Sequence, residues 1–186
     1  MATAVSICSN ALLMLGQKPI SSFTEGDFAD LASNLYPQVR DAMQRSHTWN
    51  CCVRRVILSP DTERPAFGYA YQYLLPTGWL RTLAVGEDGD EIAYKTEGRR
   101  ILIDEPVLKL RYLMRNEVED TWDGLLIHGM GLAMKAVMAY AVTKSQAVAD
   151  SADAKLREFM KTARAVDGQD DPPDELGDYP LFNSRF

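Results

Sequence analysis

The chain has 186 residues, with 20 Lys and Arg side chains against 26 Asp and Glu, so its formal net charge is −6. The hydrophobic fraction of 46% and the charged fraction of 25% are those of an ordinary globular domain, which excludes collagen, a coiled coil and disorder along the whole chain. The negative charge and the absence of a run of Lys and Arg argue against a protein that coats nucleic acid, because such proteins displace phosphate counterions with clustered cations.

The sequence predicts neither a membrane span nor a secretory signal. We find no apolar stretch near the roughly 20 residues that cross a bilayer, and residues 1–15 have no basic region at their start. The sequence holds three cysteines, Cys8, Cys51 and Cys52, which is an odd number. Their spacing suits neither a zinc site nor a disulfide-stapled secreted domain. We therefore expect a protein of a reducing cytosol, with no cofactor and no membrane partner.

Two helices are predicted at the N-terminus. Residues 3–15 carry apolar or small side chains at helical spacing, and Gly16 is placed to end the helix. Residues 27–46 repeat the pattern, with Asp27 as the predicted N-cap. Pro37 interrupts this second segment, which is therefore either one kinked helix or two short ones.

After Trp49 the hydrophobic period changes from that of a helix to that of a strand. Between about residues 52 and 115, β-branched and aromatic residues alternate with others in five or six short segments separated by turn residues. One segment carries Tyr69, Tyr71 and Tyr73 on the same side. We predict that these tyrosines form a sheet face packed on the helices.

Two further helices are predicted after the β section. The stronger one covers residues 120–146, and its small residues Gly129, Ala133 and Ala136 would let another backbone approach closely. The second covers about residues 150–165. Helical spacing of apolar residues on both sides of the β section predicts that all four helices pack into one bundle.

Residues 167–186 change character, with paired prolines and no helical period. They hold six acidic groups and Arg185, a net charge of −5, which leaves −1 of the total −6 for the rest of the chain. We predict an extended acidic arm that docks on a partner, the alternative being a frayed terminus. The candidate docking residues are Asp170, Asp171, Asp174, Glu175, Tyr179, Leu181, Phe182 and Phe186.

The predicted fold class is α+β, a bundle of about four helices with a β-rich insert between the second and third helices. Residues 1–50 hold the first helices, 51–116 the insert, 117–166 the last helices and 167–186 the extended acidic arm.

Candidate catalytic and metal-binding groups are few and dispersed. His47 and His128 fall in different elements; we expect His47 to cap a helix and His128 to lie in or beside the core. The pair Asp104 and Glu105 falls in a predicted turn, where carboxylates are solvated. The sequence holds no GxSxG, SxxK or Walker motif. We predict no catalytic, cofactor-binding or metal-binding residue and no enzymatic activity.

Two motifs that suggest chemistry are better explained by packing. Adjacent cysteines such as Cys51 and Cys52 rarely satisfy disulfide geometry without backbone strain, so we predict that one is a small buried residue at the start of a strand. Gly129 and Gly131 resemble the opening of a dinucleotide-binding motif, but Met134 stands at the third glycine position and the pattern is helical. Close helix packing explains these glycines.

Four segments form an ordered set. They are A-x-x-x-L-G-x-x-P-I-x-S from Ala11 to Ser22; Leu35-Tyr36-Pro37 with Val39-Arg40-Asp41, His47-Thr48-Trp49-Asn50, Arg54, Arg55 and Leu58; Tyr71-Gln72-Tyr73-Leu74-Leu75-Pro76 with Trp79-Leu80-Arg81; and Glu97-Gly98-Arg99-Arg100-Ile101-Leu102 with Leu110-Arg111-Tyr112. In order and spacing these segments resemble the tail tubular protein A family of tailed bacteriophages, the head-to-tail adaptors below the portal. The resemblance spans about residues 5–165. The sequence departs from the family pattern at Cys51-Cys52, where an aromatic residue followed by a small one is expected.

The resemblance implies a virion structural protein of the head-tail junction, made and assembled in the cytoplasm of the bacterial host. It implies a homo-oligomeric ring of twelve copies that binds the portal protein and accepts the next tail component, a nozzle or tail tube. DNA would pass through its channel without sequence-specific binding, and the arm would dock on the portal. The alternatives are another phage neck or tail-completion protein, or an unrelated soluble enzyme or regulator.

Overall fold

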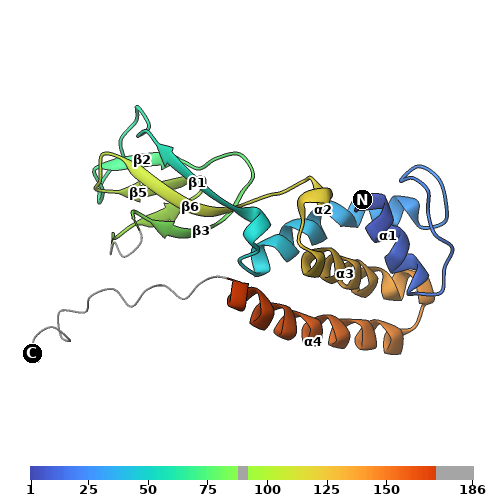
Figure 1. The fold of residues 1–186 in the computed structure, drawn as a ribbon. Coiled ribbons are helices and arrows are strands. Elements are labelled where there is room, and N and C mark those ends of the chain that lie inside the picture. Colours follow the sequence, from blue (N-terminus) through green and yellow to red (C-terminus); the bar gives the residue numbers. More distant parts are fainter. Residues whose placement is uncertain (88–91, 171–186) are drawn as a thin grey trace, which may run out of the picture.

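A bundle of helices and a pair of β-sheets lie side by side in the computed structural model, which describes residues 1–87 and 92–170 (Figure 1). The helices are α1 (Ala4–Leu13), α2 (Ala29–Ser46), α3 (Gly124–Thr143) and α4 (Gln146–Asp170), with short 3-10 turns η1 (Asn50–Cys52) and η2 (Glu119–Thr121). The strands are β1 (Val53–Leu58), β2 (Tyr71–Leu74), β3 (Trp79–Val85), β4 (Lys95–Glu97), β5 (Arg100–Ile103) and β6 (Leu108–Met114). The predicted α+β class, with about four helices around a β insert, is confirmed.

The two N-terminal helices begin in different ways. Thr3 caps α1 through a capping box, in which its hydroxyl accepts from the amide of Ser6 at 3.1 Å and the Ser6 hydroxyl accepts in return. Phe28, rather than the predicted Asp27, occupies the N-cap position of α2, with a left-handed φ of 65°. Its ring packs against the bundle core, so packing sets this helix start. α2 is one continuous helix through Pro37.

α3 is the central helix of the bundle and contacts α1, α2 and α4. It begins at Gly124 rather than near residue 120, because the Asp123 carboxylate accepts from the amide of Leu125 at 2.7 Å and caps the first turn. Close packing explains Gly129: a Cβ atom there would lie 2.8 Å from Cε1 of Phe159 on α4. The interpretation of Gly129 as a packing residue is thus confirmed, whereas at Gly131 a Cβ atom would make only an ordinary contact with Met14 at 3.8 Å.

The prediction that the chain lacks an apolar stretch of membrane-spanning length is wrong. α3 is 20 residues long with a mean hydropathy of 1.6, enough by length and composition to cross a bilayer. Half of this stretch is buried inside the bundle, the environment of a core helix. The buried half packs against three other helices, which accounts for much of the apolar composition.

The insert consists of two three-stranded antiparallel sheets, with strand orders β1-β6-β3 and β2-β5-β4. Their inner faces form a second core, separate from that of the bundle. Tyr73 is fully buried there, and its hydroxyl donates to the carbonyl of Glu105 at 2.7 Å. The prediction that the tyrosine face packs on the helices is therefore wrong, because Tyr71 and Tyr73 face the other sheet instead.

The chain passes between bundle and insert twice, and the two passages are joined by buried hydrogen bonds. The Gln44 side chain donates to the carbonyl of Asn116 at 2.8 Å and accepts from its amide at 3.0 Å. The Asn116 side chain donates to the carbonyl of Cys51 at 3.1 Å and to the hydroxyl of Thr121 at 2.9 Å. We call these four residues the junction network.

Two further contacts strengthen the same region. Asp41 on α2 accepts from Arg115, which follows β6, through both carboxylate oxygens at 3.0 and 2.8 Å. Trp49 is fully buried in the bundle core, and its indole N–H donates to the carbonyl of Met43 at 3.1 Å. The last turn of α2 is thereby tied to both passages of the chain.

The buried position of Trp49 predicts a large loss of stability on truncation. Trp49→Ala should lower the free energy of unfolding by about 3–5 kcal/mol, because a large cavity opens in the bundle core. The control is Phe67→Ala, since Phe67 is 88% exposed; it should change stability by less than about 0.5 kcal/mol. Urea unfolding measures both variants. A loss below about 1 kcal/mol for Trp49→Ala would contradict its placement in the core.

The two buried glycines of α3 provide a matched pair of variants. Alanine at either position gains about 1 kcal/mol of helix propensity. At Gly131 the nearest atom to the new Cβ is the Met14 methyl at 3.8 Å, an ordinary contact, whereas at Gly129 the Phe159 ring must move. We expect Gly129→Ala to be less stable than Gly131→Ala by about 1–3 kcal/mol. Equal melting temperatures would contradict the close approach of α3 and α4.

Candidate interaction surfaces

The predicted docking residues of the C-terminal arm fall almost entirely outside the described part of the chain. α4 continues to Asp170, so the prediction that helix ends near residue 165 and an arm starts at 167 is wrong. The helix extends further because the first prolines, Pro172 and Pro173, come only after it. The residues that lie outside the described ones are Asp171, Asp174, Glu175, Tyr179, Leu181, Phe182 and Phe186.

The starting point of this C-terminal segment is nevertheless described. α4 runs back along α3 from the connection between them, and its last turn lies at the end of the bundle that carries the insert (Figure 1). The described part of the chain therefore ends at Asp170, at the end of the bundle that carries the insert.

The histidines do not come together. His47 is the C-cap residue of α2, as predicted, and its ring meets that of Trp49 edge-on with centroids 4.9 Å apart. His128 is exposed rather than in the core, although its ring meets Phe159 edge-on at 5.0 Å. Among the residues that the structure describes, no group of three His, Cys, Asp or Glu could hold a metal ion.

The strongest pKa shifts of the described residues occur near the junction rather than in a cleft. Burial, together with the charge of Glu119, raises the pKa of Tyr36 well above its ordinary range; the Tyr36 hydroxyl donates to Glu119 at 3.0 Å. Burial raises the pKa of Cys8 to about 12. These shifts keep both groups neutral.

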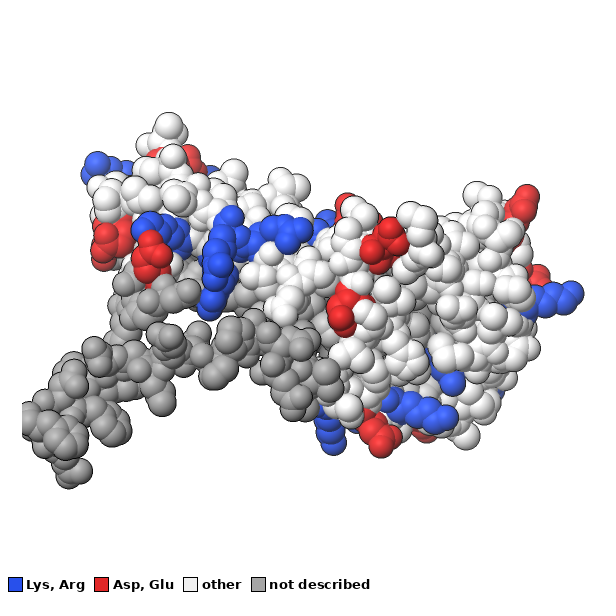
Figure 2. Space-filling model, in the orientation of Figure 1, with Lys and Arg blue, Asp and Glu red and all other residues white. Residues whose placement is uncertain are grey.

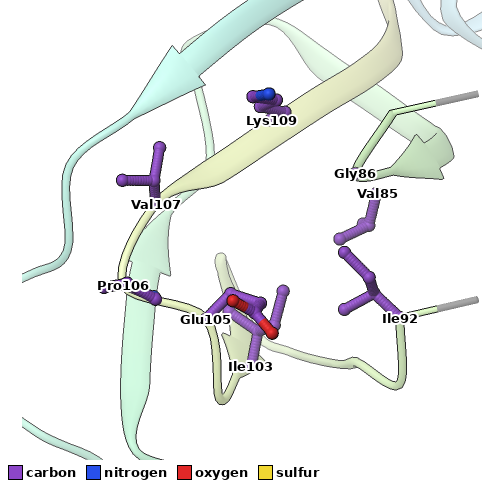
Figure 3. Close-up of a pocket in the computed structure, with 8 residues that line it drawn as sticks. All are labelled: Val85, Gly86, Ile92, Ile103, Glu105, Pro106, Val107 and Lys109. Atoms are coloured by element: carbon purple, nitrogen blue, oxygen red, sulfur yellow. The ribbon is translucent and has the colours of Figure 1, made fainter. Parts of the chain in front are cut away.

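A small pocket opens between the two sheets of the insert (Figure 3). Side chains of Val85, Ile92 and Ile103 line its inside, and Glu105 lies near them. Its volume of about 240 Å³ is below the roughly 300–1,000 Å³ of ordinary ligand sites. Lys109 also lines the pocket, but its ammonium group is ion-paired with Glu87. One carboxylate beside apolar walls offers little to orient a ligand, so this pocket is an open end of the insert core.

The outer face of the sheet β1-β6-β3 carries basic residues that a search for sequence runs misses. Arg55 on β1 lies directly opposite Arg111 on β6, and Lys109 is two residues along the same strand. Blue side chains gather over the insert in Figure 2. Lys109 pairs with Glu87, and Arg55 and Arg111 also have interaction partners. The basic side chains of this face are therefore engaged within the protein, and for Lys109 the partner is a carboxylate.

Exposed apolar side chains occur on two sides of α3. On one side a groove of about 400 Å³ lies between α1 and α3, with Leu13 52% and Met14 40% exposed at its rim. Farther along α3, Val137 and Tyr140 are also exposed. Because an α-helix has 3.6 residues per turn, Val137 and Tyr140 lie on roughly the opposite side of α3 from Ile127 and Gly131, which face the groove. Apolar surface of this kind marks contacts with other proteins.

The sequence also indicates that apolar residues beside the groove are exposed. Leu13 and Met14 lie off the apolar stripe of the first helix, so they had to be exposed or to cover something else. The basic face had a weaker signal, since Arg55, Lys109 and Arg111 alternate with apolar residues in predicted strands. Their position opposite one another depends on strand register, which the sequence does not reveal.

No protein-family model matches the chain, and a comparison with curated proteins finds no match. The observations that bear on function are therefore the resemblance of the four sequence segments and the surfaces described above.

Proposed function

We propose that the protein is a virion structural protein, a head-to-tail adaptor that forms a ring below the portal, continues the DNA channel and attaches the tail. The observation that carries this proposal is the exposure of apolar side chains on two opposite sides of α3. Rings form through heterologous contacts, in which one flank of each subunit binds the opposite flank of the next. A central helix with two apolar flanks suits that arrangement.

The segments that resemble the adaptor family also support the proposal. They include residues that build this fold, such as the buried Trp49 and Tyr73 and the Asp41 that binds Arg115. The segments that carry the resemblance thus include positions that build the two cores and the polar junction of this fold. An adaptor would depend on such residues, because they fix the shape with which it contacts its partners.

The C-terminal segment is the proposed portal-docking element. The residues after Asp170 include Asp171, Asp174, Glu175 and Asp178, followed by the apolar Tyr179, Leu181, Phe182 and Phe186. An acidic segment that ends in aromatic residues suits a partner groove with basic and apolar parts, and its binding should weaken as salt screens the charges.

DNA would pass the ring without sequence-specific contacts. Outside residues 167–186 the chain has a net charge near −1, and the basic side chains of the outer sheet face have partners. A nearly neutral wall binds duplex DNA weakly, because affinity for phosphates depends on the release of counterions by free cations. The remaining partner is the next tail component, a nozzle or tail tube.

Mixing the full chain with the portal protein of the same virion tests the proposal. Negative-stain electron microscopy should show an added ring below the portal. A chain that ends at Asp170 keeps all of α4, so it should fold normally yet lose at least about tenfold in portal affinity, because the docking segment is gone. Replacing the four acidic residues after Asp170 with Asn and Gln should abolish the salt dependence of binding.

The outcomes separate the alternatives. Failure of the folded full chain to bind the portal at any stoichiometry would contradict the proposal. Binding to a tail tube instead of the portal would favour a tail-completion protein. Unchanged portal binding by the chain that ends at Asp170 would keep the adaptor function and reject the docking role of the segment.

A further inference from the structure

Two thiols touch each other at the passage from bundle to insert. Cys51 and Cys52 form the end of η1, and their Sγ atoms lie 3.9 Å apart. Cys52 is fully buried in the bundle core, which confirms the predicted packing role for one of the pair. Cys51 is only half-buried, so it is the more accessible residue of the pair.

The surroundings of Cys51 favour its thiolate. The hydrogen bond between the Cys51 and Cys52 thiols, aided by one from the amide of Asp123 at the N-terminus of α3, lowers the pKa of Cys51 to about 7; burial and the Asp123 carboxylate oppose this shift. The same hydrogen bond, together with burial, raises the pKa of Cys52 well above its ordinary range, although Arg54 opposes this. Cys51 is thus the thiol of the pair that loses its proton more readily, and it is also the less buried one.

We propose that Cys51 and Cys52 form a redox-active dithiol, in which Cys51 reacts with a hydroperoxide and Cys52 then closes a disulfide. In the first step the Cys51 thiolate attacks the peroxide, an S–O bond forms, the O–O bond breaks, and the leaving oxygen takes up a proton to become an alcohol or water. In the second step the Cys52 thiol gives up its proton and its sulfur attacks the sulfenic sulfur of Cys51; an S–S bond forms, the S–O bond breaks, and the leaving hydroxide takes up the proton to become water.

Ring closure requires the backbone to move. Consecutive Cα atoms are about 3.8 Å apart across a trans peptide, below the roughly 4.4–6.8 Å of ordinary disulfides. The carbonyl of Cys51 accepts from Asn116, and the amide of Cys52 donates to the carbonyl of Trp49 at 2.8 Å. Oxidation should therefore loosen the junction network, and a strained bond of this kind is readily reduced by thiols.

This inference concerns the thiols alone and does not depend on the adaptor function. Hydrogen peroxide is the probe, added to the full chain at neutral pH, with the product analysed by the mass of the peptide that contains Cys51 and Cys52. The peptide should lose the mass of two hydrogen atoms and regain it with dithiothreitol. Hydrogen exchange at the Cys52 amide should be faster in the oxidised protein.

Single-cysteine variants assign the roles. Cys51→Ser should remove the fast reaction, and Cys52→Ala should stop at a Cys51 sulfenic acid that dimedone traps. Cys8→Ala is the matched control, since Cys8 is fully buried, and it should behave like the unchanged chain. Circular dichroism checks that each variant is folded, and Cys52→Ser replaces Cys52→Ala if that variant is not.

Alkylation by iodoacetamide gives a second measurement that needs no disulfide. At pH 7 Cys51 should react at least about tenfold faster than Cys8, because the thiolate is the nucleophile. An unchanged rate of peroxide reaction in Cys51→Ser, an intermolecular disulfide as the product, or alkylation of Cys51 no faster than that of Cys8 would each overturn the proposal.

Discussion

The buried hydrogen bonds between Gln44 and Asn116 are the constraint on which the rest of the structure depends. The Gln44 side chain forms hydrogen bonds with both the amide and the carbonyl of Asn116, as the backbone of a neighbouring strand would. Both residues are buried, and buried polar groups are expensive when they lose their partners. The Asn116 side chain then extends the network to Cys51 and Thr121, which fixes both passages of the chain.

This network matters because the molecule has two cores. The bundle core and the insert core are separate clusters, but Leu80 and Leu113 of the insert strands pack into the bundle core. The junction network and the contact of Asp41 with Arg115 add polar contacts to this apolar packing, and together they fix the angle between bundle and insert. A ring subunit must present its surfaces at a fixed angle to its neighbours. The proposed adaptor function and the proposed redox chemistry of Cys51 both act through this one place.

Periodicity in the sequence predicted the four helices and the β section, because burial of one face imposes a spacing of 3.6 or 2 on apolar residues. The prediction that one of Cys51 and Cys52 is a small buried residue at the start of a strand is confirmed, since Cys52 is fully buried directly before β1. Periodicity did not predict that the tyrosine face packs on a second sheet, since a strand pattern shows which side is buried but not what covers it. The start of α2 at Phe28 and the pairing of Arg55 with Arg111 depend on tertiary packing and register, which no local pattern encodes.

The measurement that tests the account most directly is urea unfolding of Gln44→Leu beside Gln72→Leu. Gln72 makes one exposed hydrogen bond to the carbonyl of Glu63 at 2.9 Å, so it is a matched control. Gln44→Leu leaves the amide and carbonyl of Asn116 buried without this partner and should lose about 2–4 kcal/mol, whereas Gln72→Leu should lose less than about 1 kcal/mol. Equal losses in the two variants would contradict the central place of the junction network.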